Sequence, residues 1–274
     1  MAELPQGPAA QPGPGRNGRP GPIPCLASLT VLLGGLALAP AAPAQSAGPA
    51  SSTGMEQAIA LLTEARLHFQ NVRDYECQLI KRERAQGTLL PESVLTMKVR
   101  SRPFSVYLRC DGPGADRGQE VCYVDGRVHT HHPLVPAGWR GIIGFVSISP
   151  TDPRAFESNR HCITEAGLGH LLDSTARYWE MERRLGKTLV HITDDDLGGR
   201  ACTRIETTHP DRSAGPFYGY RCVLWLDKAT HLPVAAETYD WPRPGGPAEG
   251  DLLEWYRYLG LRCNIGLDDH AFPR

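Results

Sequence analysis

Three histidines near the middle of the sequence, His129, His131 and His132, form the densest group of potential metal ligands. Alternate residues of a β-strand point to one face, so His129 and His131 would suit two ligands of a zinc or copper site. A third ligand would have to come from elsewhere, with His161 and Asp195 as the candidates. A polar hairpin arm accounts for the same histidines without any metal, and we favour that interpretation.

A second group of possible ligands is the acidic run 194–196, which is followed by Gly198 and Gly199. Carboxylate oxygens are the ligands that calcium prefers, but the spacing of an EF-hand loop is absent. An acidic hairpin turn explains this run better. The sequence therefore predicts a turn here and no calcium site.

The sequence also lacks the residue patterns of familiar nucleophilic and metal-dependent enzymes. It contains no G-x-S-x-G, P-loop or H-E-x-x-H motif. His161 and Cys162 are neighbours on an extended segment and face opposite ways, and Glu180 and Glu182 fall on opposite faces of a predicted helix. We therefore nominate no catalytic residue, and we expect a protein that is not an enzyme and holds no cofactor or metal.

The elements that would position a site are strands with one apolar and one charged face. Apolar and polar residues alternate through 75–84, 93–100 and 104–110, a pattern typical of antiparallel strands whose sheet has one solvated side. Further strands are predicted at 120–125, 127–132, 188–193 and 200–207, and three more follow residue 222. The strands are thus expected to form one large sheet.

Two helices interrupt the strands. Residues 55–72 and 164–186 carry apolar side chains at helical spacing. The order helix, strands, helix, strands excludes regular alternation of strand and helix, and it favours an α+β fold with one large antiparallel sheet.

The segment from Val223 to Phe272 resembles the C-terminal part of the LolA/LolB-like superfamily of bacterial lipoprotein carriers. The positions that carry this resemblance are Asp227, Thr230, Leu232 and Pro233, followed by Asn264, Gly266, Leu267, Asp269 and Phe272. Segments 75–84 and 97–109 look like those of an uncharacterised family of secreted bacterial proteins within the same superfamily. The two resemblances together cover residues 55–274.

The resemblance implies a single domain over residues 55–274, in which a large curved antiparallel sheet forms a half-open β-barrel and helices cover its concave face. It implies that something hydrophobic is held between the sheet and the helices. The apolar residues that fit such a site are Leu95, Met97, Val99, Phe104, Val106, Leu108, Leu168, Leu171, Leu172, Trp179, Tyr220, Leu224 and Leu226. Plain core packing also explains each of them, and a binding site differs from a core only if space is left inside.

Three functions follow as hypotheses. The leading one is a carrier that buries a lipid or the acyl chains of a lipoprotein, acting in lipoprotein trafficking or in sensing the state of the cell envelope. The second is a protein-interaction or scaffold module whose concave face is filled by its own side chains, with an envelope protein as partner. The third is a metal-dependent enzyme that uses His129 and His131.

The N-terminal region predicts export. The uncharged apolar run 25–38 is too short to cross a bilayer comfortably, and Ala42-Pro43-Ala44 is a small-residue cleavage pattern. We predict a secretory signal at 1–44, a flexible spacer at 45–54 and a periplasmic or secreted protein, with an anchor formed by the uncleaved segment as the alternative. The net charge of −1 gives nothing that attracts nucleic acid.

Cysteine usage leaves the pairing open. The sequence has eight cysteines, of which Cys25 lies in the predicted signal. Seven others remain, so at least one is unpaired, and no C-x-x-C pair suggests a redox or zinc site. The remaining seven are compatible with one or two disulfides or with none.

Overall fold

One antiparallel sheet organises the computed structural model, which describes residues 50–113, 117–126, 131–132, 146–147, 149–157 and 159–273. All of these residues belong to the unit Ala47–Arg274. Twelve strands of the described residues join in the order β7-β6-β5-β4-β3-β1-β12-β11-β10-β9-β8, and β2 pairs with β1. The strands are β1 (Asp74–Ala85), β2 (Thr88–Leu89), β3 (Ser93–Arg100), β4 (Ser105–Cys110), β5 (Glu120–Val124), β6 (His131–His132), β7 (Val146–Ser147), β8 (Leu189–Asp196), β9 (Ala201–Thr208), β10 (Arg221–Asp227), β11 (Pro233–Tyr239) and β12 (Leu252–Cys263).

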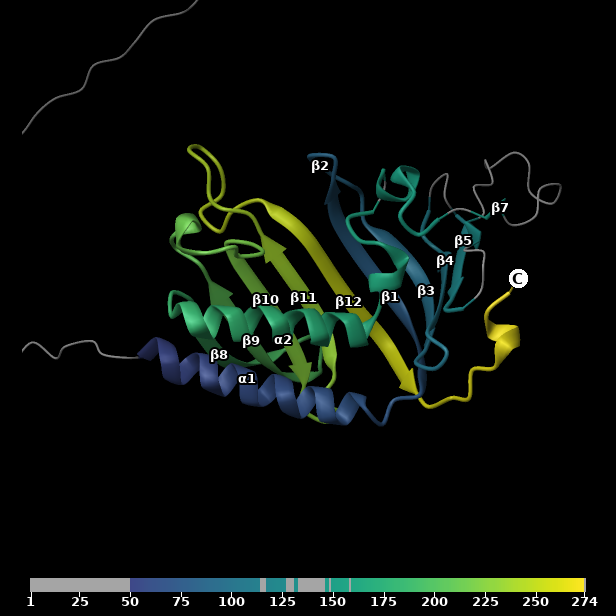
Figure 1. The fold of residues 1–274 in the computed structure, drawn as a ribbon, viewed down its shortest axis with the longest axis horizontal. Coiled ribbons are helices and arrows are strands. Elements are labelled where there is room, and N and C mark those ends of the chain that lie inside the picture. The colour runs from purple at the N-terminus through teal and green to yellow at the C-terminus, as the bar shows by residue number, and fades with distance from the viewer. Residues whose placement is uncertain are drawn as a thin grey trace, which may run out of the picture. The chain divides into compact units, whose positions relative to one another are not determined.

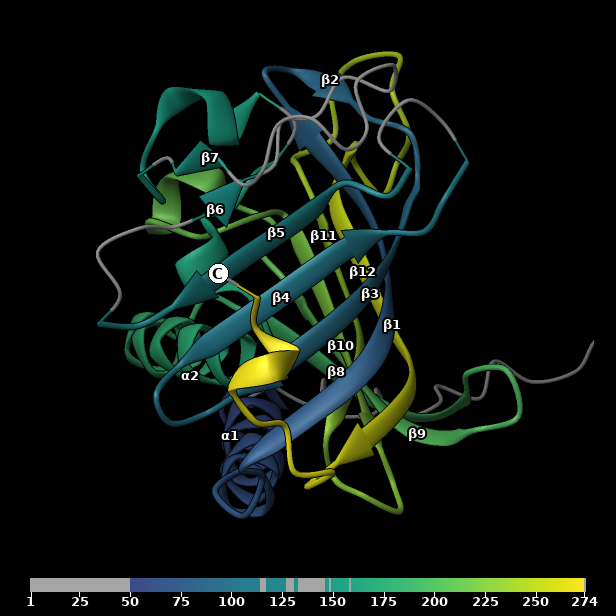
Figure 2. The same ribbon diagram turned by 90° about the vertical axis from the view of Figure 1, so that its right-hand side faces the viewer.

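Strands β1 and β12 join the N-terminal strands of the sheet to its C-terminal strands. These two long strands pair antiparallel over most of their length, so that Tyr75 lies opposite Cys263 and Glu83 lies opposite Glu254. Strands β3 to β5 continue from β1, and strands β11 to β8 continue from β12. The sheet therefore has its longest strands at its centre, and it curves around the two helices (Figure 2).

Helices α1 (Ala50–Phe69) and α2 (Leu168–Leu185) run side by side along the concave face of the sheet (Figure 1). Short 3-10 helices lie at Pro153–Phe156, Ile163–Glu165, Arg212–Ala214 and Asp269–Ala271. Helix α2 buries Leu168, Leu172, Trp179 and Glu182, which share one face at helical spacing. It ends at Gly186, whose left-handed backbone favours glycine.

Helix α1 packs on both α2 and β8. Its buried stripe is formed by Met55, Ala58, Leu62 and Ala65, three or four residues apart. The helix begins at Ala50, so the last five residues of the predicted spacer 45–54 are helical. That part of the spacer prediction was wrong because tertiary packing overrides the poor helix propensity of Ser, Thr and Gly. The backbone of Gly54 lies so close to β8 that a Cβ there would be 3.2 Å from Val190 Cβ.

The turns at the two ends of the C-terminal strands are built by acidic side chains. Asp227 Oδ1 accepts hydrogen bonds from the backbone N–H groups of Ala229 and Thr230, at 3.1 and 2.7 Å. Asp74 Oδ1 accepts from the N–H groups of Ile265 and Gly266, at 2.8 and 3.0 Å. Carboxylates that satisfy turn N–H groups fix the direction of the next segment. Residues that carried the sequence resemblance thus shape turns.

The α+β prediction, with one large antiparallel sheet and helices on its concave face, is confirmed. The predicted strand 93–100 matches β3, and most of the others differ at their ends by a few residues. Of the predicted strand 127–132, only His131 and His132 are among the described residues, and they form β6. The second helix begins at Leu168 instead of Thr164, because a separate 3-10 turn occupies Ile163–Glu165. No helix in the described part of the chain combines the length and the hydrophobicity needed to span a membrane. The predicted signal 1–44 lies outside the described residues.

The N-terminus of α2 is held by a tyrosine from the sheet. The backbone N–H of Leu168 donates to the hydroxyl of Tyr75 at 2.8 Å, and both side chains are fully buried. The preceding Gly167 has φ +96°, and a Cβ there would lie 2.5 Å from the same hydroxyl. Glycine is thus required for this close approach of helix and strand.

We expect the Tyr75→Phe substitution to lower the free energy of unfolding by about 1–3 kcal/mol, because it leaves the buried N–H of Leu168 without its acceptor. Urea denaturation followed by circular dichroism measures the change. A difference within about 0.5 kcal/mol of the wild type would show that this hydrogen bond does not hold the start of α2.

Candidate functional site: a cavity between helix α2 and the sheet

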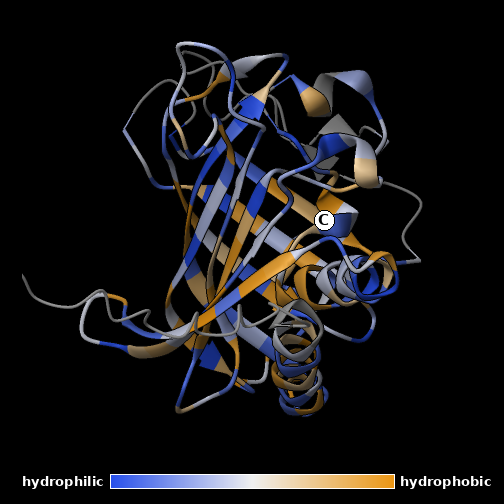
Figure 3. Ribbon diagram, turned by 90° about the vertical axis from the view of Figure 1, so that its left-hand side faces the viewer, coloured by the Kyte–Doolittle hydropathy of each residue, from blue (hydrophilic) through white to orange (hydrophobic). Residues whose placement is uncertain are grey.

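A cavity of about 540 Å³ lies between α2 and the concave face of the sheet. Strands β1, β3, β4, β5 and β9 to β12 contribute side chains to its wall, and α2 covers it. Hydrophobic residues, in orange, recur between hydrophilic ones along the strands and along both helices (Figure 3). Space is therefore left between the elements, which is the condition that separates a binding site from a core.

Six of the thirteen predicted binding residues line the cavity. They come from three strands and the covering helix and are Leu95, Met97, Leu108, Leu171, Trp179 and Leu224. Leu79, Val121 and Ile163 add further apolar surface. Alternate residues of a strand point to one face of the sheet, and the inner face of α2 lies opposite that face. The side chains at these positions therefore meet at the cavity.

The other seven predicted residues lie outside the cavity wall. Val99, Val106 and Leu168 are buried in the core cluster between β1, β3, β4 and α2, and Phe104 packs against this cluster. Leu172 and Leu226 belong to the cluster that joins α1, α2 and the sheet. Tyr220 is half-buried just before β10. Core packing, the alternative interpretation, describes the position of these residues.

One end of the cavity, beside the paired strands β1 and β12, is polar. Glu83 of β1 and Glu254 of β12 are paired across the two central strands and are only 4% and 6% exposed. The Tyr256 hydroxyl donates its hydrogen bond to Glu83 Oε1 and lies 3.5 Å from Glu254 Oε2. Two buried carboxylates side by side are costly unless cations and donors surround them.

Glu83 is compensated by a lysine from its own strand. The Lys81 ammonium lies 2.8 Å from Glu83 Oε2, and the backbone N–H of Arg160 donates to the same oxygen at 3.2 Å. Burial by itself would raise the pKa of the Glu83 carboxyl, but the Lys81 charge and these hydrogen bonds outweigh it and hold the pKa below its usual value. Glu83 is thus ionised at neutral pH.

Glu254 is compensated by groups from the segment before α2. His161 Nε2 lies 2.7 Å from Glu254 Oε2, and Arg160 Nε lies 3.2 Å from the same oxygen. Burial would lower the pKa of His161, but its hydrogen bond to Glu254 and the charge of that carboxylate outweigh burial and raise the pKa. Burial also raises the pKa of the Tyr218 and Tyr256 hydroxyls, which therefore remain protonated donors.

A third ionisable pair borders the cavity. Glu182 of α2 lies with its Oε2 3.2 Å from His209 Nε2, and the two side chains are 3% and 0% exposed. His209 Nδ1 lies 2.6 Å from the carbonyl oxygen of Gly219, and its ring stacks on Phe217 at 4.2 Å between centroids. A carbonyl can only accept, so Nδ1 carries a proton and Nε2 faces the carboxylate. This pair joins α2 to the segment before β10.

The polar groups of the cavity are better suited to hydrogen-bonding a ligand than to acting as a base or a nucleophile. The carboxylates of Glu83 and Glu254 already have cationic partners, so neither is a free base or nucleophile. The tyrosine hydroxyls and the imidazole of His161 provide hydrogen-bonding atoms to the cavity. The arrangement can hold a molecule with an apolar body and a polar end.

A model for a protein family matches residues 72–274, and its description is "Protein of unknown function (DUF1571)". The chain belongs to the DUF1571 family. The predicted membership in an uncharacterised family is thereby confirmed. The matched range contains every residue of the cavity wall, whereas α1 precedes it. No curated protein matches this DUF1571 chain.

Several solved structures resemble the DUF1571 chain. The lipoprotein LppX of Mycobacterium tuberculosis is 11% identical over 78% of this chain and 98% of its own, with a TM-score of 0.44. A putative outer membrane lipoprotein-sorting protein domain from Vibrio parahaemolyticus is 14% identical over 81% and 97%, with a TM-score of 0.37. A LolA superfamily protein from Nitrosomonas europaea is 14% identical over 78% and 96%, with a TM-score of 0.32. Similarity at this level carries no argument about ligands.

The histidine hypothesis concerns residues that the structure of the DUF1571 chain describes only in part. His129 lies outside the described residues. The backbone of His131 forms β6 between Cys122 and Ser147. Of the two proposed third ligands, His161 bonds to Glu254, and Asp195 Oδ2 accepts from the indole N–H of Trp225 at 2.8 Å. Both of these candidates therefore have other partners.

The acidic run 194–196 of the DUF1571 chain lies at the end of β8. Asp194 pairs with Lys228 at 2.6 Å, and Asp196 Oδ1 accepts from the N–H of Gly199 at 2.6 Å. The acidic-turn interpretation fits this geometry, because Asp196 organises the turn into β9.

The polar end of the cavity was not predicted, although the sequence contained a signal for it. Lys81 and Glu83 continue the inward-facing series that begins with Tyr75, Cys77 and Leu79. Charged residues at inward positions of a strand are exceptions to the apolar pattern and mark candidate sites. The partners on β12 and before α2 could not be paired with them without the register.

The contact between His161 and Glu254 predicts how stability depends on pH. Because the pKa of His161 is raised by folding, its stabilising contribution is present below its usual pKa of about 6.5 and is lost as the pH rises through the raised value. We expect the wild type to exceed His161→Gln in free energy of unfolding by more at about pH 6 than at about pH 9. Urea titrations of both proteins at the two pH values measure this difference. An unchanged or opposite difference would contradict the assignment.

Proposed function

We propose that this protein binds a hydrophobic ligand, a lipid or the acyl chains of a lipoprotein, in the cavity between α2 and the sheet, and that it does so without catalysing a reaction. The observation that supports this proposal is the cavity of about 540 Å³, whose wall combines leucine, methionine and tryptophan side chains with a buried hydrogen-bonding cluster.

Burial of acyl chain supplies the binding energy in this proposal. Each methylene group moved from water into an apolar site contributes about 0.8 kcal/mol, so ten of them contribute about 8 kcal/mol before ordering costs. That gross value corresponds to a dissociation constant of about 1 µM. Trp179, Met97 and Leu224 are among the apolar side chains of the wall.

The polar end would receive the hydrophilic part of the ligand. Tyr256, Tyr218 and His161 lie there with the two carboxylates that they contact. A pure hydrocarbon would leave these groups facing an apolar surface, which costs free energy. An acyl chain that ends in a polar head group matches both ends of the cavity.

We propose that the protein works in the periplasm or outside the cell, in lipoprotein trafficking or in sensing the envelope. Export would depend on the signal at 1–44, with the domain beginning near residue 55. Intact mass and N-terminal sequencing of protein recovered from the expressing bacterium test the signal. An N-terminus at Gln45 supports cleavage after Ala44, whereas Met1 in the recovered protein contradicts it.

The binding proposal is tested by native mass spectrometry of tag-free protein purified from the periplasm without detergent, followed by solvent extraction of the complex. We expect an adduct that disappears on extraction and yields a lipid in the extract. We also expect N-phenyl-1-naphthylamine, a neutral apolar dye, to bind the extracted protein with a fluorescence increase that the lipid reverses. Absence of both lipid and dye binding would overturn the proposal in favour of a scaffold with a filled cavity.

A further inference from the structure

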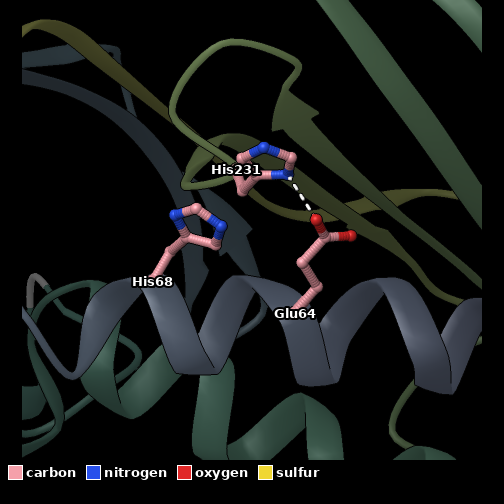
Figure 4. Close-up of side chains that lie close together, drawn as sticks. All are labelled: Glu64, His68 and His231. Atoms are coloured by element: carbon pink, nitrogen blue, oxygen red, sulfur yellow. Dashed lines mark ion pairs between the residues drawn. The ribbon is translucent and has the colours of Figure 1, made fainter.

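Three potential metal ligands converge on the outer side of α1, away from the cavity wall. Glu64 and His68 project from α1 toward His231, which lies in the turn between β10 and β11 (Figure 4). One ligand atom from each residue can be chosen so that all of them lie within 4.8 Å of one another. The residues come from segments more than 160 positions apart, so the tertiary fold brings them together.

The two ligands on α1 are placed by helix geometry. Glu64 and His68 are four residues apart and therefore share one face of the helix, one turn from each other. The same helix packs against α2 through its buried apolar stripe, and Arg66 also pairs with Asp173 of α2 at 2.9 Å. The face that carries Glu64 and His68 is consequently presented to the β10–β11 turn in one orientation.

His231 is placed by a constrained turn. Its backbone has φ +60°, a conformation that residues other than glycine rarely adopt, and its N–H donates to the carbonyl of Asp227 at 2.8 Å. The side chain of Asp227 holds the same turn through Thr230. The imidazole of His231 thereby stacks on His68 at 4.2 Å between ring centroids, and its Nδ1 lies 3.2 Å from Glu64 Oε1.

We propose that Glu64, His68 and His231 bind one divalent transition-metal ion of the zinc type. Zinc takes imidazole nitrogen and carboxylate oxygen at about 2.0–2.2 Å, so two ligand atoms in a tetrahedral site are about 3.4 Å apart. The separation of Glu64 Oε1 and His231 Nδ1, 3.2 Å, already fits this value. A rotation of the His68 side chain that breaks its stack on His231 brings a His68 nitrogen into the same shell, and solvent fills the fourth position.

The ligand set also selects among metals. Two imidazoles with one carboxylate suit zinc, copper or nickel, whereas calcium and magnesium prefer shells made of oxygen. An ion here would tie α1 to the turn between β10 and β11. Because α1 packs with α2 through Leu62 and Ala65, the metal would stabilise the helical layer that covers the concave face.

Isothermal titration of ZnCl₂ into tag-free protein, dialysed against EDTA and then into chelator-free buffer with a phosphine reductant, tests the site. We expect one zinc per chain and a rise in melting temperature on zinc addition, with no comparable effect of MgCl₂. The absence of both a heat of binding and a rise in melting temperature would overturn the proposed zinc site. That result would not bear on the proposed binding of lipid in the cavity.

Variants separate this site from the cysteines and from other surface histidines. His231→Asn retains a residue that tolerates the left-handed backbone, and His68→Gln retains a helix former. Each should weaken zinc binding at least about tenfold, since even indirect supporting contacts are worth about 10–100-fold. His191→Gln, on exposed β8, is the matched control and should bind zinc like the wild type. Equal zinc affinity in His231→Asn and the wild type, with both folded by circular dichroism, would contradict the assignment.

Discussion

Replacing Glu182 by alanine is expected to lower the free energy of unfolding by about 1–3 kcal/mol, because it leaves the buried Nε2 of His209 without the carboxylate that faces it. The two side chains are 3% and 0% exposed and lie 3.2 Å apart. His209 is also held by the Gly219 carbonyl and by stacking on Phe217, so it cannot turn toward solvent. Urea denaturation at neutral pH measures the loss.

The control for this experiment is two residues away on the same helix. Glu180 pairs with Arg183 and Arg184, at 2.9 and 3.0 Å, on the solvent side of α2. Surface pairs of this kind contribute little to stability because water and salt screen them. Glu180→Ala should therefore leave the urea midpoint almost unchanged. Similar losses in Glu180→Ala and Glu182→Ala would contradict a special contribution of the buried pair, because alanine is the better helix former and neither loss could come from helix propensity.

The contrast between Glu180 and Glu182 also shows what the sequence could predict. Helical spacing placed them on opposite faces of the helix, and the structure agrees. Helical spacing could not identify the partner of Glu182. His209 follows two further strands in the chain, and only the register of the sheet brings it to Glu182. Local periodicity thus predicted which face of α2 each glutamate occupies, whereas the partner of Glu182 depends on the tertiary structure.

The same division applies to the strands. Alternation in 93–100 correctly predicted that Leu95, Met97 and Val99 face inward, and all three are buried. It could not predict that Met97 and Leu95 reach the cavity whereas Val99 lies in the core. That outcome depends on where α2 crosses the strands, and Gly167 with Tyr75 sets this crossing. The direction in which a side chain points is set within its own strand, whereas the cavity depends on how the helices and the sheet pack together.

The inward-facing polar residues of the cavity depart most from the apolar pattern of the strands. Glu83, Glu254 and Tyr256 occupy inward positions that an apolar core would fill with aliphatic side chains. Sequences violate such local rules mainly at functional sites. The polar end of the cavity is thus the feature that most distinguishes this concave face from ordinary core packing.

Filling part of the cavity should weaken ligand binding while the fold is retained. In Leu108→Trp combined with Leu171→Trp, two half-buried wall residues are enlarged into the open volume. Excluding about two methylene groups of an acyl chain costs about 1.6 kcal/mol, which weakens binding about fifteenfold. Titration with N-phenyl-1-naphthylamine after solvent extraction measures the change in affinity.

The matched control is Leu189→Trp, which makes the same substitution on β8 at a side chain that is 55% exposed. It adds an indole to the surface and leaves the cavity unchanged, so its dye affinity should equal that of the wild type. Circular dichroism and urea midpoints establish that both variants are folded, because overpacking by itself can destabilise a core. Dye affinity that is unchanged in the folded double variant would place the apolar ligand outside this cavity.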